Sequence, residues 1–101
     1  MNTKDKNAEL EQRVDALWNI LESRQGETFY TAKKLPFQYT IRGGEMFVDR
    51  RSRSITKATF LNAMKKLQEH PGEIKGPKKL NVFGAPYVWA ILTELGLTNI
   101  S

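Results

Sequence analysis

Residues 37–49 read FQYTIRGGEMFVD, and this stretch decides the fold. Apolar and polar residues alternate on both sides of the Gly43-Gly44 pair. A two-residue glycine loop between alternating runs is typical of a tight hairpin, because the turns that match the twist of paired strands need positive φ. The stretch therefore predicts a β-hairpin with strands at 37–42 and 45–49.

The register of this hairpin follows by counting outward from the turn. Arg42 comes opposite Glu45, and their opposite charges favour that pairing. Successive side chains point to opposite faces, so one face is predicted to be the core face and carries Phe37, Tyr39, Ile41, Met46 and Val48. Phe47 stands on the other, polar face. We expect it either to be covered by the helix predicted at 86–95 or to stack on a nucleic-acid base.

Amphipathic helices are predicted on both sides of the hairpin, at 7–24 and 57–69. In the first, apolar residues recur with helical spacing at Leu10, Val14, Leu17, Trp18 and Leu21. The second is predicted to begin after Thr56, whose hydroxyl suits an N-cap, and to end before Pro71.

The remaining segments complete an α+β pattern. The β-branched and aromatic run 28–31 is predicted as the third strand of an antiparallel sheet. Prolines, glycines and lysines over residues 70–85 predict an irregular basic loop. Within it, residues 80–83 are expected to form a short strand or a loop segment held by buried side chains. An apolar C-terminal helix is predicted at 86–95. We expect one domain over residues 7–101, after a flexible tail at 1–6.

Composition argues against several classes of protein. The chain has no cysteine and one histidine, His70, so the usual zinc sites and a cysteine nucleophile are excluded. No pair of carboxylates has a spacing that suggests acid–base catalysis, so we expect no enzymatic activity, cofactor or metal. The longest apolar run is too short to cross a bilayer, and the polar start contains no readable signal peptide. We therefore expect a cytoplasmic protein without membrane contact.

The net charge of +5 is concentrated in the middle of the chain. Residues 25–80 carry twelve basic and five acidic side chains, whereas residues 1–24 and 81–101 each have a net charge of −1. Such a basic centre predicts a polyanionic partner. The alternative is a lysine-rich surface that serves only solubility.

The candidate contacts lie around the hairpin. Arg50, Arg51 and Arg53 precede the N-terminus of the helix predicted at 57–69, and such a terminus attracts phosphate. The Lys33-Lys34 pair enters the hairpin at the same end, so the basic side chains are predicted to cluster. The predicted nucleic-acid-binding residues are Lys33, Lys34, Arg50, Arg51, Arg53, Lys57, Lys65 and Lys66.

Several stretches resemble a group of small uncharacterised bacterial proteins. They are TFYTAK at 28–33, LPFQYTI at 35–41, GEMFV at 44–48, SITKAT at 54–59 and GPKKLNVFGA at 76–85. The resemblance covers most of residues 28–92. Because that group has no assigned activity, the resemblance implies no functional residue and supports only one co-folding unit.

The predicted order of helix, three strands and helix is similar in topology to the double-stranded-RNA-binding fold. That family has a Lys-Lys-x-Ala-Lys signature at the start of its second helix, whereas residues 56–60 here read TKATF, with one lysine. A standard winged helix places its hairpin after the recognition helix, which is the reverse of the order here.

Two functions follow. The first is a non-enzymatic nucleic-acid-binding domain, with DNA expected ahead of RNA. The second is a protein-interaction module or homodimer that uses the apolar helix at 86–95.

Overall fold

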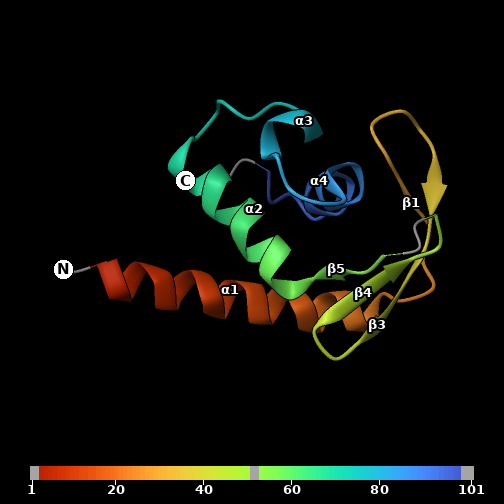
Figure 1. The fold of residues 1–101 in the computed structure, drawn as a ribbon, viewed down its shortest axis with the longest axis horizontal. Coiled ribbons are helices and arrows are strands. Elements are labelled where there is room, and N and C mark those ends of the chain that lie inside the picture. Colours follow the sequence, from red (N-terminus) through yellow and green to blue (C-terminus); the bar gives the residue numbers. More distant parts are fainter. Residues whose placement is uncertain (1–2, 51–52, 99–101) are drawn as a thin grey trace.

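In the computed structural model, which describes residues 3–50 and 53–98, helix α1 (Thr3–Ser23) runs along one side of the molecule (Figure 1). The predicted apolar stripe of this helix is buried. The helix begins at Thr3 rather than at residue 7, so residues 3–6 belong to it and not to a tail. No glycine or proline interrupts this polar segment. Apolar spacing reveals only the part of a helix that packs on a core.

The predicted hairpin forms with the predicted register. Strand β3 (Tyr39–Arg42) pairs antiparallel with β4 (Glu45–Val48), with Tyr39 opposite Val48 and Arg42 opposite Glu45. The core face is buried as expected, except that Ile41 is half-buried. Alternation along both strands therefore placed the side chains on their correct faces.

The sheet has three antiparallel strands, but its third strand is not the predicted one. Strand β5 (Ile55–Thr56) pairs with β4 and completes the sheet. The run predicted at 28–31 instead forms β1 (Phe29–Tyr30), which pairs with β2 (Pro36–Phe37) in a separate two-stranded sheet. A strand of two residues is too short to show the alternation of apolar and polar residues, so β5 could not be recognised from the sequence. Pro36 cannot donate to a ladder, which suits an edge strand.

Helix α2 (Lys57–Glu69) follows the prediction closely. The Thr56 hydroxyl accepts a hydrogen bond from the backbone N–H of Thr59, and His70 is the C-cap. The buried stripe is Phe60, Ala63, Met64 and Leu67. The next segment departs from the predicted loop, because Pro77–Leu80 forms a short helix, α3. Proline suits the first turn of a helix, and Leu80 is fully buried.

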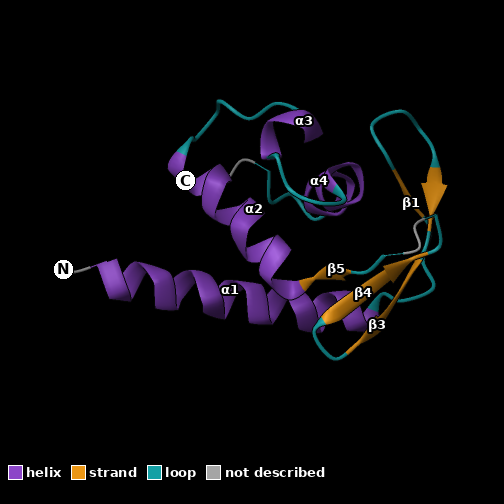
Figure 2. Ribbon diagram, in the orientation of Figure 1, coloured by secondary structure: helices purple, strands orange, loops and turns teal. Residues whose placement is uncertain are grey.

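Helix α4 (Ala85–Glu94) explains the apolar C-terminal run, predicted one residue later at 86–95. Its residues Val88, Ala90, Ile91 and Leu92 are buried inside the same chain. The helix contacts α3 and β1. In Figure 2 the strands lie towards the C-terminal end of α1, while α2, α3 and α4 lie on the same side of α1. Deep packing thus accounts for the apolar character that also suggested an interface.

Three hydrogen bonds tie the end of α1 to the hairpin. Trp18 Nε1 donates to the carbonyl oxygen of Gly43 at 2.7 Å, and Tyr39 Oη donates to the carbonyl oxygen of Leu21 at 2.6 Å. Gln25 Oε1 accepts the backbone N–H of Ile41 at 2.6 Å. The hairpin is therefore held on its core side and at its β3 edge. The radius of gyration, 13.1 Å, is that of one domain of this length.

Candidate nucleic-acid interface

Four of the predicted basic residues flank the end of the hairpin opposite the glycine turn. We call Lys33, Lys34, Arg50 and Arg53 the basic end. The lysines lie in the loop between β1 and β2, and Arg50 follows β4. Arg50 Nε donates to the carbonyl oxygen of Pro36 at 2.6 Å, which links the residue after β4 to the start of β2. The side chains of all four are exposed.

The lysine loop is held in a defined shape. The Lys34 N–H donates to the Thr31 carbonyl at 2.8 Å, and the Thr31 N–H donates to the Leu35 carbonyl at 3.0 Å. The Thr31 hydroxyl also accepts the Leu35 N–H at 3.1 Å. This tight loop holds Lys34 at a φ of +68°, a value that most non-glycine residues avoid.

Arg53 is positioned by an aromatic ring. Its guanidinium lies over the ring of Phe83, 4.7 Å from the centroid. Such stacking orients a guanidinium while leaving its N–H groups free to meet oxygen acceptors. Arg51, another predicted contact, lies outside the described residues.

The N-terminus of α2 does not join the basic end, which corrects the predicted cluster. Strand β5 runs antiparallel to β4, so Thr56 lies opposite Glu45, beside the glycine turn. The Lys57 N–H already donates to the Gly44 carbonyl at 2.9 Å, and Thr56 takes up the Thr59 N–H. The Lys57 ammonium forms an ion pair with Asp15 of α1. The unpredicted strand β5 is the physical reason for this displacement.

Lys65 and Lys66 also lie apart from the basic end, on α2. Lys66 Nζ donates to the carbonyl oxygen of Leu80 at 2.7 Å and to that of Asn81 at 3.4 Å. It therefore satisfies carbonyls at the end of α3 and has a structural role. Lys65 is exposed. Sequence reasoning left out a further group of exposed lysines near α3, namely Lys75, Lys78 and Lys79.

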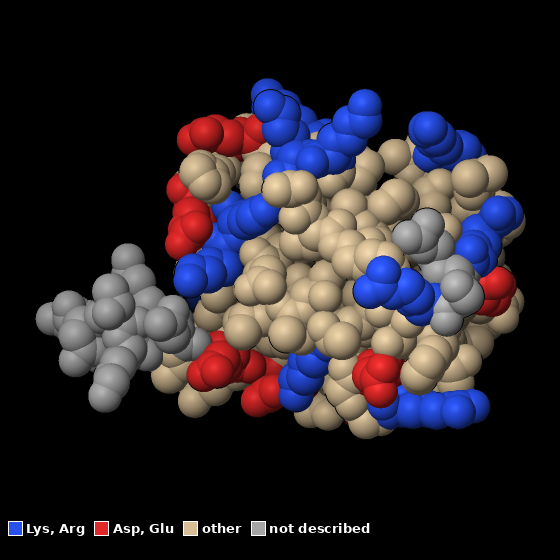
Figure 3. All heavy atoms as spheres, in the orientation of Figure 1, with Lys and Arg blue, Asp and Glu red and all other residues tan. Residues whose placement is uncertain are grey.

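Figure 3 shows that Lys and Arg side chains do not merge into one continuous surface on the face in view. They form separate groups near the rim, among them one over the α3 region and others at the side of the β1–β2 loop and the β4–β5 connection. Several carboxylates lie between these groups. On this face the positive charge is therefore divided among separate groups.

Phe47 is exposed, so the first of its two expected arrangements, a cover by the C-terminal helix, is not found. Its side chain is 37% exposed, and the Arg42 guanidinium lies 5.6 Å from its ring centroid. Arg42 and Phe47 share the polar face of the hairpin as diagonal neighbours, because Phe47 pairs with Thr40. Glu45 and Asp49 stand on the same face, so it carries no excess of positive charge.

Few basic groups are neutralised within the described part of the chain. There, Arg24 and Lys57 are the only Lys or Arg side chains in ion pairs, with Glu27 at 2.8 Å and with Asp15. The hydrogen bond and charge of Glu27 raise the pKa of Arg24, and the charge of Glu94 adds to this. None of the four residues of the basic end is in an ion pair within residues 3–50 and 53–98, which leaves their charge available to an anion.

One further site was missed by sequence reasoning. A groove of about 540 Å³ lies between the β1–β2 loop and α4, and Lys34 of the basic end lines it. Its other lining residues are Tyr30, Thr31, Ala32, Trp89, Ala90, Thr93 and Glu94. No local pattern could reveal this groove, because its two walls are far apart in the sequence.

Other classes of site find no support in residues 3–50 and 53–98. This part of the chain contains no cluster of three potential metal ligands, and none of its helices has the length and apolarity of a membrane span. Comparisons with protein-family models, curated proteins and solved structures found no match to the chain.

Proposed function

We propose that this chain is a non-enzymatic nucleic-acid-binding domain whose basic end contacts the phosphate backbone. One observation carries the proposal: the Arg50–Pro36 hydrogen bond joins two chain segments that carry four exposed cations, and none of the four is in an ion pair within the described residues. Cations paired with carboxylates would have to break those pairs before they could bind phosphate. Cations that are not in ion pairs can bind phosphate without breaking such pairs. Their binding releases counterions from the nucleic acid, which is the main source of affinity for the phosphate backbone.

Geometry adds to the charge. Arg50 and Arg53 are each positioned by a contact of the guanidinium, with the Pro36 carbonyl and with the Phe83 ring respectively. An arginine that is already oriented loses less conformational entropy when its fork meets phosphate oxygens. Of the predicted contacts, Lys57 and Lys66 are engaged inside the protein, so the proposed interface is the basic end, with Arg51 as a further candidate in sequence.

We expect DNA to bind ahead of RNA. The start of α2 carries one lysine where the double-stranded-RNA-binding signature has three, and the Lys57 ammonium is paired with Asp15. The start of α2 therefore does not provide the lysines with which that family binds an A-form duplex. Phosphate contacts position a protein without reading bases, so the basic end predicts no sequence preference. A nucleic-acid partner also agrees with the expected cytoplasmic location.

The proposal is tested by fluorescence anisotropy with short labelled duplexes of DNA and RNA at several salt concentrations. Each neutralised phosphate contributes a slope of about −0.9 in log affinity against log salt. With about four contacts, DNA affinity should fall on the order of 10²-fold between 50 and 200 mM salt. Failure to bind either duplex at 50 mM salt would remove this function.

The alternative, homodimerisation through residues 86–95, gains less from the structure. Burial of α4 in its own chain already explains its apolar surface. Tyr87 and Trp89 are only partly exposed, and both pack against the hydrophobic core of their own chain. A stable homodimer normally needs a large and more continuous apolar patch.

A further inference from the structure

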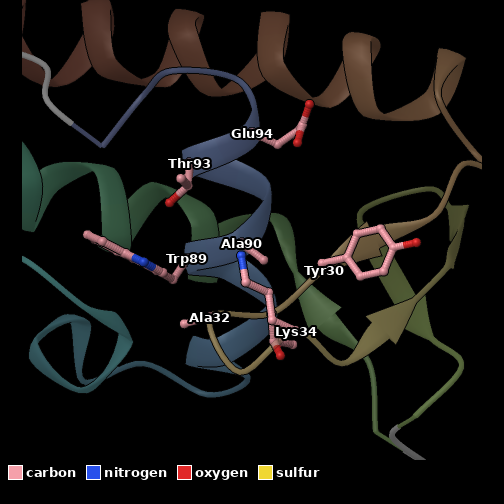
Figure 4. A pocket seen from close by; sticks show the side chains of 8 residues that line it. Tyr30, Ala32, Lys34, Trp89, Ala90, Thr93 and Glu94 are labelled. Carbon is pink, nitrogen blue, oxygen red and sulfur yellow. The ribbon is translucent and has the colours of Figure 1, made fainter.

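The groove between the β1–β2 loop and α4 is lined by both small and large side chains. Ala32 on the loop and Ala90 on the helix face the space, and larger side chains stand around it. Its volume of about 540 Å³ falls within the range of small-ligand sites. In Figure 4 the Lys34 side chain stretches across the exposed side of α4, with Trp89 on one side of it and Tyr30 on the other.

The groove combines three kinds of binding group. Tyr30 offers a flat aromatic surface that is 60% exposed, an unusual exposure for a large ring. Lys34 supplies a cation that is in no ion pair within the described part of the chain, and Glu94 supplies a carboxylate one helical turn beyond Ala90. A matching ligand therefore carries a planar ring, an anionic group and a hydrogen-bond donor.

An unpaired nucleotide has all three of these features. Its base can stack on the Tyr30 ring, its phosphate can meet Lys34, and an amino group on the base edge can donate to Glu94. Lys34 belongs to both the basic end and the groove. A nucleic-acid strand bound at the basic end therefore has its next nucleotide beside the groove. Zwitterionic ligands such as amino acids would match the two charges but leave the exposed ring of Tyr30 unused.

The carboxylate at the end of the groove has a cation in its surroundings. Glu94 and Arg24 interact, since the charge of Glu94 contributes to raising the pKa of Arg24 after the larger effect of Glu27. A cation is therefore close enough to Glu94 for the two charges to interact.

We infer that this groove binds one unpaired nucleotide whose base carries an exocyclic amino group, next to the strand or duplex held by the basic end. The inference rests on the proposed function and adds a base-reading subsite to it. The two aromatic rings diverge from Lys34 in Figure 4, so the base stacks on one ring, Tyr30, and is not clamped between two. Trp89 lines the same groove and serves as a natural reporter of occupancy.

The test uses three short single-stranded probes of equal length and charge: deoxycytidine, thymidine and abasic sugar phosphate. Cytosine presents an amino group where thymine presents an acceptor oxygen. We expect the deoxycytidine probe to bind about tenfold more tightly than the abasic probe, the effect of one stacked base. We expect thymidine to be intermediate, because it stacks but cannot donate to Glu94. Tryptophan emission should change with the two base-bearing probes only, since Trp18 is buried against Phe60.

Two variants separate the contributions. Tyr30→Ala should bring all three probes to the affinity of the abasic one, and Glu94→Gln should remove the preference for cytosine over thymine while stacking persists. Both positions are exposed, and unfolding curves check that the fold is kept. Salt-dependent binding of duplex DNA should be unchanged in both variants, because neither residue belongs to the basic end.

The possible outcomes distinguish the two proposals. If the three probes bind with equal affinity and the binding depends on salt, the proposed nucleotide site in the groove is wrong and the proposed function of the basic end is kept. The same conclusion follows if both variants keep the wild-type preferences among the probes. A base-dependent change in tryptophan emission without salt-dependent duplex binding would overturn the basic end and support the groove. Absence of binding by every probe and duplex would overturn both.

Discussion

The β3–β4 hairpin and the segment from His70 to Ala85 are held in place in different ways. The hairpin has a continuous backbone ladder, and two further hydrogen bonds hold it, one donated by Trp18 of α1 and one accepted by Gln25 just after α1. The segment has only the four-residue helix α3 and depends on separate anchors. These anchors are buried Ile74 and Leu80, the Lys66 ammonium, the Arg53–Phe83 stack and a close approach of Gly84 to Ile55.

This difference has a consequence for stability. Loss of one bond from a ladder leaves its neighbours paired, whereas loss of one anchor frees a stretch with few other contacts. We therefore expect single substitutions at the anchors of 70–85 to cost more than single substitutions in the hairpin. The basic end depends on both regions, because Arg50 follows the hairpin and Arg53 stacks on Phe83 of the segment.

The largest effect is expected at Gly84. Its φ is +69°, and a Cβ placed there would come within 2.6 Å of Ile55 Cδ1 and 2.9 Å of Ile55 Cγ1. Gly84→Ala therefore combines a left-handed backbone penalty with overpacking against a fully buried side chain, at a cost of about 3 kcal/mol. Gly72→Ala is the matched control, because Gly72 has a φ of +75° and open space around it. Equal losses in urea unfolding would show that the approach to Ile55 is unimportant.

A smaller loss is expected when the Lys66 anchor is removed. Lys66→Met keeps most of the aliphatic stem but leaves the Leu80 and Asn81 carbonyls without their donor. Hydrogen bonds from charged groups contribute more than neutral ones, so we expect a loss of about 1.5 kcal/mol. Lys65→Met, on the neighbouring exposed position, should be nearly neutral. Chemical denaturation of both variants measures the difference, and identical midpoints would contradict the anchoring role.

In the hairpin the two turn glycines should differ. Gly43 has a φ of +62°, whereas Gly44 is not in the positive-φ region, a pattern that fits a type II′ turn. Gly43→Ala should therefore cost about 1 kcal/mol, and Gly44→Ala should have little effect. The sequence predicted positive φ in the Gly43-Gly44 turn, and of the two glycines only Gly43 adopts it. A larger loss at Gly44 than at Gly43 would overturn this assignment of the turn.

The smallest effect at neutral pH concerns Tyr39, which becomes important only in alkali. Burial raises the pKa of Tyr39 from 10.0 to about 12. The folded state thus favours the neutral phenol, whose Oη donates to the Leu21 carbonyl. This contribution is complete below pH 10 and is lost as the pH rises through about 12. Thermal unfolding between pH 9 and 12 should show the loss in the wild type and a weaker pH dependence in Tyr39→Phe.

The hairpin could be predicted down to its register because its information is local. Alternation, the glycine pair and the Arg42–Glu45 charges all lie within thirteen consecutive residues. The apolar stripes of α1 and α2 were equally readable, since each repeats over several turns.

The parts that could not be predicted depend on pairing between distant segments. Strand β5 has two residues and exists because it pairs with β4, and its direction carries the start of α2 away from the basic end. That is why Lys57 was expected among the phosphate contacts and is found paired with Asp15. The groove was unpredictable for the same reason, because Tyr30 and Glu94 meet only in the folded chain.

The salt dependence of DNA binding by a double variant tests the central claim most directly. Arg50→Gln with Arg53→Gln removes two charges from the basic end, and Lys75→Gln with Lys78→Gln removes two exposed charges elsewhere. We expect the first variant to flatten the slope of log affinity against log salt by about 1.8 units, and the second to leave the slope close to that of the wild type. Equal slopes for the two variants would contradict the assignment of phosphate binding to the basic end.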